Sequence, residues 1–217
     1  MIWIDHSRDF PKGSHTVFSP SQPGWMKDET EDDVLRRYSS SIAAKIGTEV
    51  HDEACECIKT RTKYTKKEAV KVITKRLVLA DISRCAFDAE FLAGNFVNFV
   101  NDALGYDMRP EQALVYSRWC AGTSDAISFD EKKKILRIHD LKTGVLPAKF
   151  EQLQGYAALF FLEYGNILGA NPSNTQIELR IYQGGEIEEQ YPTAEDIVPI
   201  MDSNIWHTNV MQSIGKG

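Results

Sequence analysis

The sequence lacks any apolar run close to the roughly 20 residues that a membrane-spanning helix needs, so we expect no contact with a membrane. Its N-terminus, MIWIDHSRDF, has no basic stretch followed by an apolar one and therefore does not resemble a secretory signal. No internal repeat, low-complexity tract or linker divides the chain. We therefore expect its 217 residues to form a single domain, residues 1–217.

Cysteine is also scarce. The four cysteines, Cys55, Cys57, Cys85 and Cys120, are scattered and form no C-x-x-C pair. This usage favours reduced thiols in a cytoplasmic protein and disfavours a disulfide framework. A zinc or iron–sulfur site built from these thiols is the less favoured alternative.

An excess of positive charge is missing as well, because the formal net charge is −6. Proteins that bind nucleic acid are often basic, since phosphate contacts supply much of their affinity. The acidic balance argues mildly against a nucleic-acid partner. It does not exclude an enzyme with a local basic groove, because acidic ligands for metal ions also lower the net charge.

The order of helical and extended patterns indicates the fold class. Apolar spacings of three to four predict helices, and alternating apolar residues predict strands. The predicted helices cover residues 31–59, 66–79, 84–104 and 148–164, and a last one starts near 193. A β region over 113–141 and a hairpin turning at Gly184 and Gly185 supply the strands. We expect an α+β or mixed α/β fold, with a mainly helical part (1–105) and a sheet-containing core (106–217).

The segment 121–144 predicts a β-hairpin of unusual polarity. If its turn is centred after Lys132, Asp125 faces Asp140 across the two strands. Both carboxylates then share a face with Ile127, Phe129, Leu136 and Ile138. Directly opposed like charges destabilise a sheet, and a divalent cation with oxygen ligands would compensate.

A plainer alternative is a solvated ion pair between Asp140 and Lys142, with Asp125 at the surface; such pairs are common and contribute little. Two features favour the metal site. The carboxylates meet in register on an apolar face, and Gly122 and Gly144 stand beside them, where the backbone comes close to a ligand or turns sharply.

Four motifs extend this pattern: IGTEVHDEA, GTSDAI, ILRIHDLKTG and QLQGY. Together, in this order and spacing, they resemble the PD-(D/E)xK nuclease superfamily, in particular its RecB-like and phage-exonuclease branch. The resemblance covers roughly residues 46–156. It implies a restriction-endonuclease-like core, a small central mixed β-sheet flanked by helices, with an N-terminal helical extension.

The resemblance also implies a metal site. Asp125, Asp140, the backbone carbonyl of Leu141 and His51 would bind Mg²⁺ or Mn²⁺. Oxygen ligands favour these ions, and one histidine shifts the balance toward Mn²⁺. Without the motif, a lone histidine such as His51 on a helix is more often a hydrogen-bonded structural residue.

The remaining motif residues would act on the substrate. Lys142 would position or activate the attacking water and offset charge on the phosphate. Gln152 and Tyr156, one helical turn apart, would orient the DNA or the lysine; without the motif they are equally well helix surface and core.

Two further residues lie near the motifs. Glu111 precedes the first strand and is kept as an alternative acid or metal ligand. His139 alternates to the face opposite Asp140, so we predict that it is not a ligand.

The family resemblance implies a metal-dependent DNA exonuclease acting on DNA ends in replication, recombination or degradation, as phage-encoded members do. Some members form rings around DNA, so a homo-oligomer is one arrangement that the resemblance allows. Members with an iron–sulfur cluster carry three cysteines near the C-terminus, whereas no cysteine follows Cys120 here. We therefore expect no iron–sulfur cluster. The chain also lacks the G-x-x-x-x-G-K-[ST] loop of a helicase.

Three other functions stay open at this point. The first is a structure-specific endonuclease of the same fold, which a covalently closed circular substrate would distinguish. The second is an inactive DNA-binding module, against which the intact Asp125, Asp140 and Lys142 argue. The third is a metal-dependent hydrolase that acts on something other than nucleic acid.

Overall fold

The computed structural model describes residues 17–20, 23–145 and 147–214, so the N-terminal decapeptide lies outside the described residues. The chain divides into two compact units, Met1–Lys45 and Ile46–Gly217. Helix α1 (Glu31–Thr60) belongs to both. None of the helices in the described part of the chain is long and apolar enough to cross a membrane.

The first unit contains a short 3₁₀ helix, η1 (Pro23–Lys27), and the beginning of α1. Thr30 and Asp33 exchange hydrogen bonds at the start of α1: the backbone N–H of each donates to the side chain of the other, both at 3.2 Å. This reciprocal capping satisfies donors that a helix start leaves unpaired. Arg37 binds both carboxylate oxygens of Asp28, at 2.6 and 2.7 Å.

The second unit is built on one five-stranded sheet of order β1-β2-β3-β4-β5. Its strands are β1 (Arg109–Ser117), β2 (Cys120–Asp130), β3 (Ile135–Leu141), β4 (Gln176–Gln183) and β5 (Glu186–Gln190). β3 and β4 run parallel, and the other neighbouring strands are antiparallel. The expected class, a small mixed sheet flanked by helices, is confirmed.

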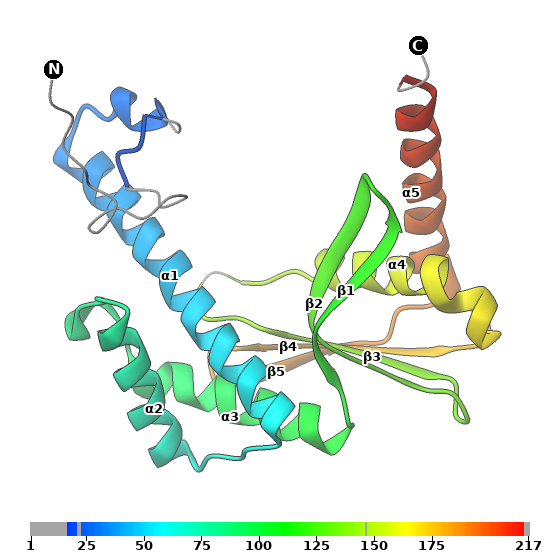
Figure 1. The fold of residues 1–217 in the computed structure, drawn as a ribbon, viewed down its shortest axis with the longest axis horizontal. Coiled ribbons are helices and arrows are strands. Elements are labelled where there is room, and N and C mark those ends of the chain that lie inside the picture. The colour runs from blue at the N-terminus through cyan, green and yellow to red at the C-terminus, as the bar shows by residue number, and fades with distance from the viewer. Residues whose placement is uncertain (1–16, 21–22, 146, 215–217) are drawn as a thin grey trace, which may run out of the picture. The chain divides into compact units, whose positions relative to one another are not determined.

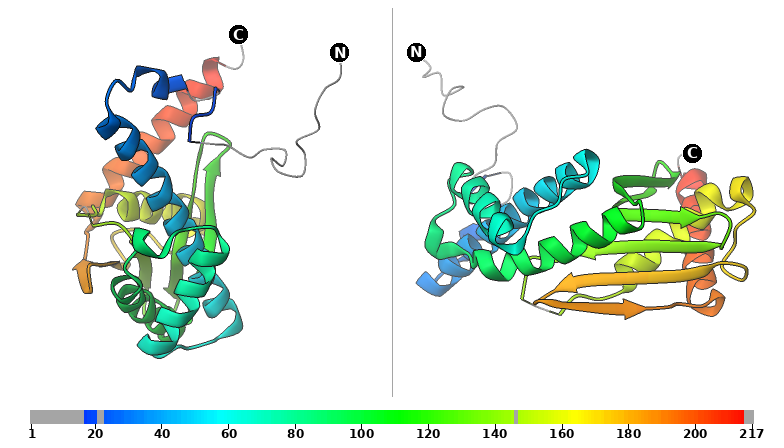
Figure 2. Two further views of the ribbon diagram at one scale, coloured as in Figure 1. Left: turned by 90° about the vertical axis from the view of Figure 1, so that its left-hand side faces the viewer. Right: turned by 90° about the horizontal axis from the view of Figure 1, so that it is seen from below.

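The remaining helices are α2 (Lys66–Leu79), η2 (Arg84–Ala86), α3 (Ala89–Gly105), α4 (Glu151–Leu168) and α5 (Ala194–Ile214). α3 and α4 lie on opposite faces of the sheet (Figures 1 and 2). α3 starts later than the predicted residue 84 because the Asp88 side chain caps it, accepting from the N–H groups of Glu90 and Phe91. α4 likewise starts at Glu151 rather than 148, and ends at Gly169 in the left-handed conformation, φ 56°.

The predicted hairpin register is confirmed. Ile127 pairs with Ile138, Phe129 with Leu136, and β2 and β3 join through a tight turn. The second predicted turn is also correct, since Gly184 and Gly185 have φ values of 64° and 84°. The face of the β2–β3 ribbon that carries these apolar residues packs on α4. The core there includes Leu136, Ile138, Leu153, Ala157, Phe160 and Phe161.

Candidate metal centre

Asp125 and Asp140 come together where the apolar face of the hairpin ends. The pairing of Ala126 with His139, continued by one residue, places the two aspartates opposite each other. The backbone N–H of Leu141 donates to Oδ2 of Asp125 at 2.9 Å, which joins the end of β3 to β2. The register inferred from alternation thus brings both carboxylates to one site.

Helix α1 adds His51 to the same site. Its Nδ1 lies 3.3 Å from Oδ2 of Asp125. Burial lowers the pKa of His51, but the hydrogen bond and charge of Asp125, with smaller contributions from Asp140 and Glu111, more than offset this and raise it. Without a metal ion, a proton on His51 would balance part of the negative charge here.

Glu111, which the sequence suggested only as an alternative, lies inside this cluster. Pro110 pairs with Ala126, and the register of β1 on β2 is unchanged two residues further on, so Glu111 stands opposite Asp125. One oxygen of Glu111, one oxygen of Asp125 and one nitrogen of His51 all lie within 4.8 Å of one another. The strand conformation is interrupted at Glu111, whose φ is 49°. Sequence reasoning missed its importance because the pairing of β1 with β2 was not predicted.

The carboxylates repel one another. Burial and the charge of Asp125 raise the pKa of Asp140, despite the opposing effect of Lys142. Burial and Asp125 likewise raise the pKa of Glu111. Three acidic side chains on adjacent strands, opposed by few cations, form a site whose electrostatics favour a bound cation.

The donor set fits a divalent metal ion. Asp140 is 2% exposed, and its Oδ2 is buried without a hydrogen bond from the described residues. The Nζ of Lys142 lies 3.0 Å from Oδ1 and 2.9 Å from Oδ2, but only the Oδ1 contact has hydrogen-bond geometry. The Asp125, Glu111 and His51 donors, with the buried Asp140 carboxylate opposite Asp125, suit the oxygen-rich coordination that Mg²⁺ and Mn²⁺ prefer.

A chain of hydrogen bonds connects Lys142 to helix α4. The Nζ of Lys142 donates to Oε1 of Gln152 at 3.1 Å, and Nε2 of Gln152 donates to the hydroxyl of Tyr156 at 2.9 Å. Gln152 and Tyr156 share a helix face because they are one turn apart. The structure thus brings Asp140, Lys142, Gln152 and Tyr156 into one connected network.

The two glycines that flank the aspartates differ. A Cβ at Gly122 would lie 2.8 Å from Cε1 of Tyr156, so only glycine lets the strand pass this ring. A Cβ at Gly144 would meet nothing within 4 Å among the described residues, and the chain bends at this position.

His139 lies on the opposite face of β3 from Asp140, as the alternation of side chains along a strand predicts. It therefore points away from the metal cluster, which comprises the side chains of His51, Glu111, Asp125 and Asp140. Its side chain is 0% exposed, and its Nδ1 lies 3.0 Å from the hydroxyl of Tyr182. Burial and the nearby cations Arg180 and Arg137 lower the pKa of His139 to about 3, so it is neutral. Leu141 meets Asp125 through its N–H; its carbonyl is kept as a proposed ligand.

Comparisons with known proteins assign the chain to no family. No protein-family model matches the chain, and no curated protein matches it significantly. The resemblance to the PD-(D/E)xK superfamily therefore rests on the four sequence motifs alone.

Proposed function

We propose that this protein is a metal-dependent phosphodiesterase of the PD-(D/E)xK type. More particularly, we propose a deoxyribonuclease that uses Mg²⁺ or Mn²⁺ and acts as an exonuclease on DNA ends. One observation carries the proposal: Asp125 and Asp140 meet in register, and the ammonium of Lys142 is bound to the second of them. This arrangement supports the proposal, because two carboxylates and a cation meet where a metal ion and a phosphate would be bound.

The proposed metal ligands are His51, Asp125, Asp140 and the carbonyl of Leu141, with Glu111 added by its place in the cluster. A bound Mg²⁺ or Mn²⁺ would supply charge stabilisation and a water of lowered pKa for attack on phosphorus. His51 must give up its proton to bind a metal ion.

In this proposal, Lys142 would act beside the metal. Its ammonium is held between Oδ1 of Asp140 and Oε1 of Gln152, so its position is set by two oxygen acceptors. From there it would orient the attacking water and stabilise the negative charge that grows on the phosphate. Gln152 and Tyr156 hold the lysine, which is a narrower role than contact with DNA.

The test is cleavage of three substrates: end-labelled linear duplex, single-stranded DNA and covalently closed circular DNA, each with Mg²⁺, Mn²⁺ or EDTA. Asp140→Asn and Lys142→Ala are compared with Lys132→Ala, which removes an exposed lysine from the turn of the same hairpin. We expect metal-dependent loss of the linear substrates in the wild type and in Lys132→Ala, and no loss in the two site variants.

The other outcomes separate the alternatives. Cutting of the closed circle would replace the exonuclease by an endonuclease of the same site. Intact binding of DNA without cleavage under either metal would favour the inactive binding module. Unchanged cleavage in Asp140→Asn would show that the aspartates of the hairpin are not the catalytic site.

A further inference from the structure

A cavity of about 690 Å³ lies outside the metal cluster, at the edge of the sheet. Strand β1 pairs with β2 only as far as Ile127, whereas β2 pairs with β3 as far as Asp130. The edge of β2 beyond Ile127 is therefore open on the β1 side, and the cavity lies along it. Its volume is in the range of sites for small organic ligands.

One wall of this cavity is aromatic. The rings of Phe129 and Phe160 have centroids 5.2 Å apart, and Tyr164 continues the row at 5.6 Å from Phe160. Phe160 is almost fully buried, whereas Phe129 and Tyr164 are half-buried. Tyr164 therefore ends the aromatic row with part of its ring free to contact a planar ligand.

Arg109 is the available cation. Its exposed side chain forms no hydrogen bond or ion pair with the described residues, although its backbone is paired with Ile127. The other cations of the cavity are engaged: Arg137 is 3.2 Å from Glu178 and 4.3 Å above the Tyr106 ring, and Lys133 is 3.9 Å from Asp130. A guanidinium that is not paired within the protein can bind a phosphate through two hydrogen bonds.

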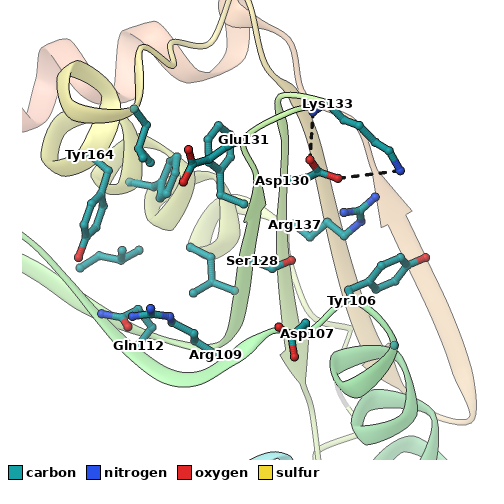
Figure 3. A pocket seen from close by; sticks show the side chains of 16 residues that line it. Tyr106, Asp107, Arg109, Gln112, Ser128, Asp130, Glu131, Lys133, Arg137 and Tyr164 are labelled. Carbon is teal, nitrogen blue, oxygen red and sulfur yellow. Dashed lines mark hydrogen bonds and ion pairs between the residues drawn. The ribbon is translucent and has the colours of Figure 1, made fainter.

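Arg109 and Tyr164 lie on the same side of the cavity, one from β1 and one from α4 (Figure 3). Burial and the neighbouring Glu163 raise the pKa of Tyr164, and the charge of Arg109 opposes this rise, as expected for a nearby cation. Gln112 lies on this side of the cavity as well (Figure 3). The opposite side carries a second group of polar side chains: Asp130, Lys133, Arg137 and Tyr106. Glu131 and Ser128 lie between the two sides.

The cavity and the metal cluster are connected through β1. In a regular strand, Arg109 and Gln112 would point to opposite faces, yet both line the cavity. The left-handed backbone of Glu111, with φ 49°, interrupts the regular strand between them, and its carboxylate lies with Asp125 and His51. Two residues of chain span about 7 Å at most, so the Cα atoms of Arg109 at the cavity and Glu111 at the metal site lie within about that distance of each other.

We propose that this cavity binds one unstacked nucleotide of a DNA single strand, with the base against Tyr164 and the phosphate on Arg109. This inference rests on the proposed function and specifies its substrate, because Arg109, which lines the cavity, stands two residues before Glu111 of the candidate metal site. Aromatic rings accept any base by stacking, so the site would have little sequence preference.

The test is binding of a fluorescent single-stranded octadeoxynucleotide, without metal, over a range of salt concentrations. Arg109→Ala should weaken binding and lower the slope of log Kd against log salt by about 0.7, as expected for one lost phosphate contact. Tyr164→Leu should weaken binding roughly 5- to 100-fold with an unchanged slope. Tyr164→Phe, which keeps the ring, and Lys132→Ala, which removes a charge outside the cavity, should bind like the wild type.

Melting temperatures exclude trivial loss of folding, and Tyr164→Phe tests the ring if Tyr164→Leu proves unstable. Unchanged affinity in Arg109→Ala and in Tyr164→Leu would overturn the inference, whether or not the wild type cleaves DNA. Loss of binding in these variants by a protein that cleaves no DNA would support the cavity and reject only the proposed nuclease activity. Equal slopes of log Kd against log salt for the wild type and Arg109→Ala would show that Arg109 does not contact a phosphate.

Discussion

The side-chain amide of Asn95 on α3 donates to the backbone carbonyl of Lys142 at 3.3 Å. Its own carbonyl oxygen accepts from the N–H of Gly185 at 2.7 Å, and Asn95 is 2% exposed. The backbone N–H of Lys142 donates in turn to the carbonyl of Tyr182 at 3.0 Å. The main chain of the proposed catalytic lysine is thus held by α3 and β4, while its side chain is held by Asp140 and Gln152.

Replacement of Asn95 should therefore impair catalysis without touching the substrate. Asn95→Ala removes the hydrogen bonds to the partly buried Lys142 carbonyl and to the Gly185 N–H, at a cost of about 1 kcal/mol. We expect kcat to fall roughly 10- to 100-fold, because small misplacements of a catalytic group are costly, with little change in KM. Asn98→Ala, an exposed position on the same helix, is the matched control. A lower melting temperature with an unchanged kcat would make Asn95 purely structural.

Replacement of Glu111 should stabilise the metal-free protein and weaken its binding of a metal ion. Glu111→Gln removes a charge that Asp125 repels, so in EDTA the melting temperature should rise by about 1–2 °C. The same variant should bind Mn²⁺ about tenfold more weakly in calorimetric titration, because one ligand has lost its charge. Glu186→Gln, on the exposed strand β5, should change neither quantity. Wild-type Mn²⁺ affinity in Glu111→Gln would exclude Glu111 as a ligand.

Gly122 should not tolerate a side chain. Its Cβ would lie 2.8 Å from the Tyr156 ring, so in Gly122→Ala the ring must move and its hydrogen bond with Gln152 is disturbed. Chemical denaturation should show a loss of about 1–3 kcal/mol, as is usual for overpacking, together with reduced cleavage. Gly144→Ala, where the new methyl group meets nothing, should match the wild type. Equal stability of both variants would contradict the close approach.

Cys57 should be chemically inert in the folded protein. It is 1% exposed, and burial together with the charges of Glu53 and Glu56 raises its pKa to about 12. Since the thiolate is the reactive species, Cys57 should resist iodoacetamide at pH 8, whereas the exposed Cys85 is accessible to it. Mass spectrometry of tryptic peptides reads both sites, and denaturant should make Cys57 reactive. Rapid native labelling of Cys57 would show that this part of α1 opens readily.

Arg76 on α2 should be important for stability because it neutralises the acidic face of α1. It lies 2.9 Å from Glu49 and 2.8 Å from Glu53, of which Glu53 is 8% exposed. Arg76→Ala leaves the Glu53 carboxylate buried and unpaired, which should cost about 2 kcal/mol after allowance for the partly exposed arginine. Glu56→Ala, at the exposed rim of the network, should cost under about 0.5 kcal/mol. Similar losses in both variants would show that burial of Glu53 does not matter.

The sequence by itself determined the hairpin and its polarity. Alternation has a period of two, so a slip of one residue would turn the apolar residues of one strand to the other face, and the short turn selects among the registers that remain. That register places Asp125 opposite Asp140, and the one-turn spacing of Gln152 and Tyr156 places both on one helix face. These relationships are local, because they join residues that are close in sequence or paired through a tight turn.

Only the tertiary structure decided the rest of the site. Glu111 reaches Asp125 through the pairing of β1 with β2, and its left-handed backbone breaks the alternation on which sequence reasoning depends. Asn95 contacts Lys142 across 47 positions of the chain, through the packing of α3 on the sheet. The cavity likewise exists because β1 leaves β2 before its end. Hydrophobic periodicity specifies which face of an element is buried, but not which distant polar group will meet it there.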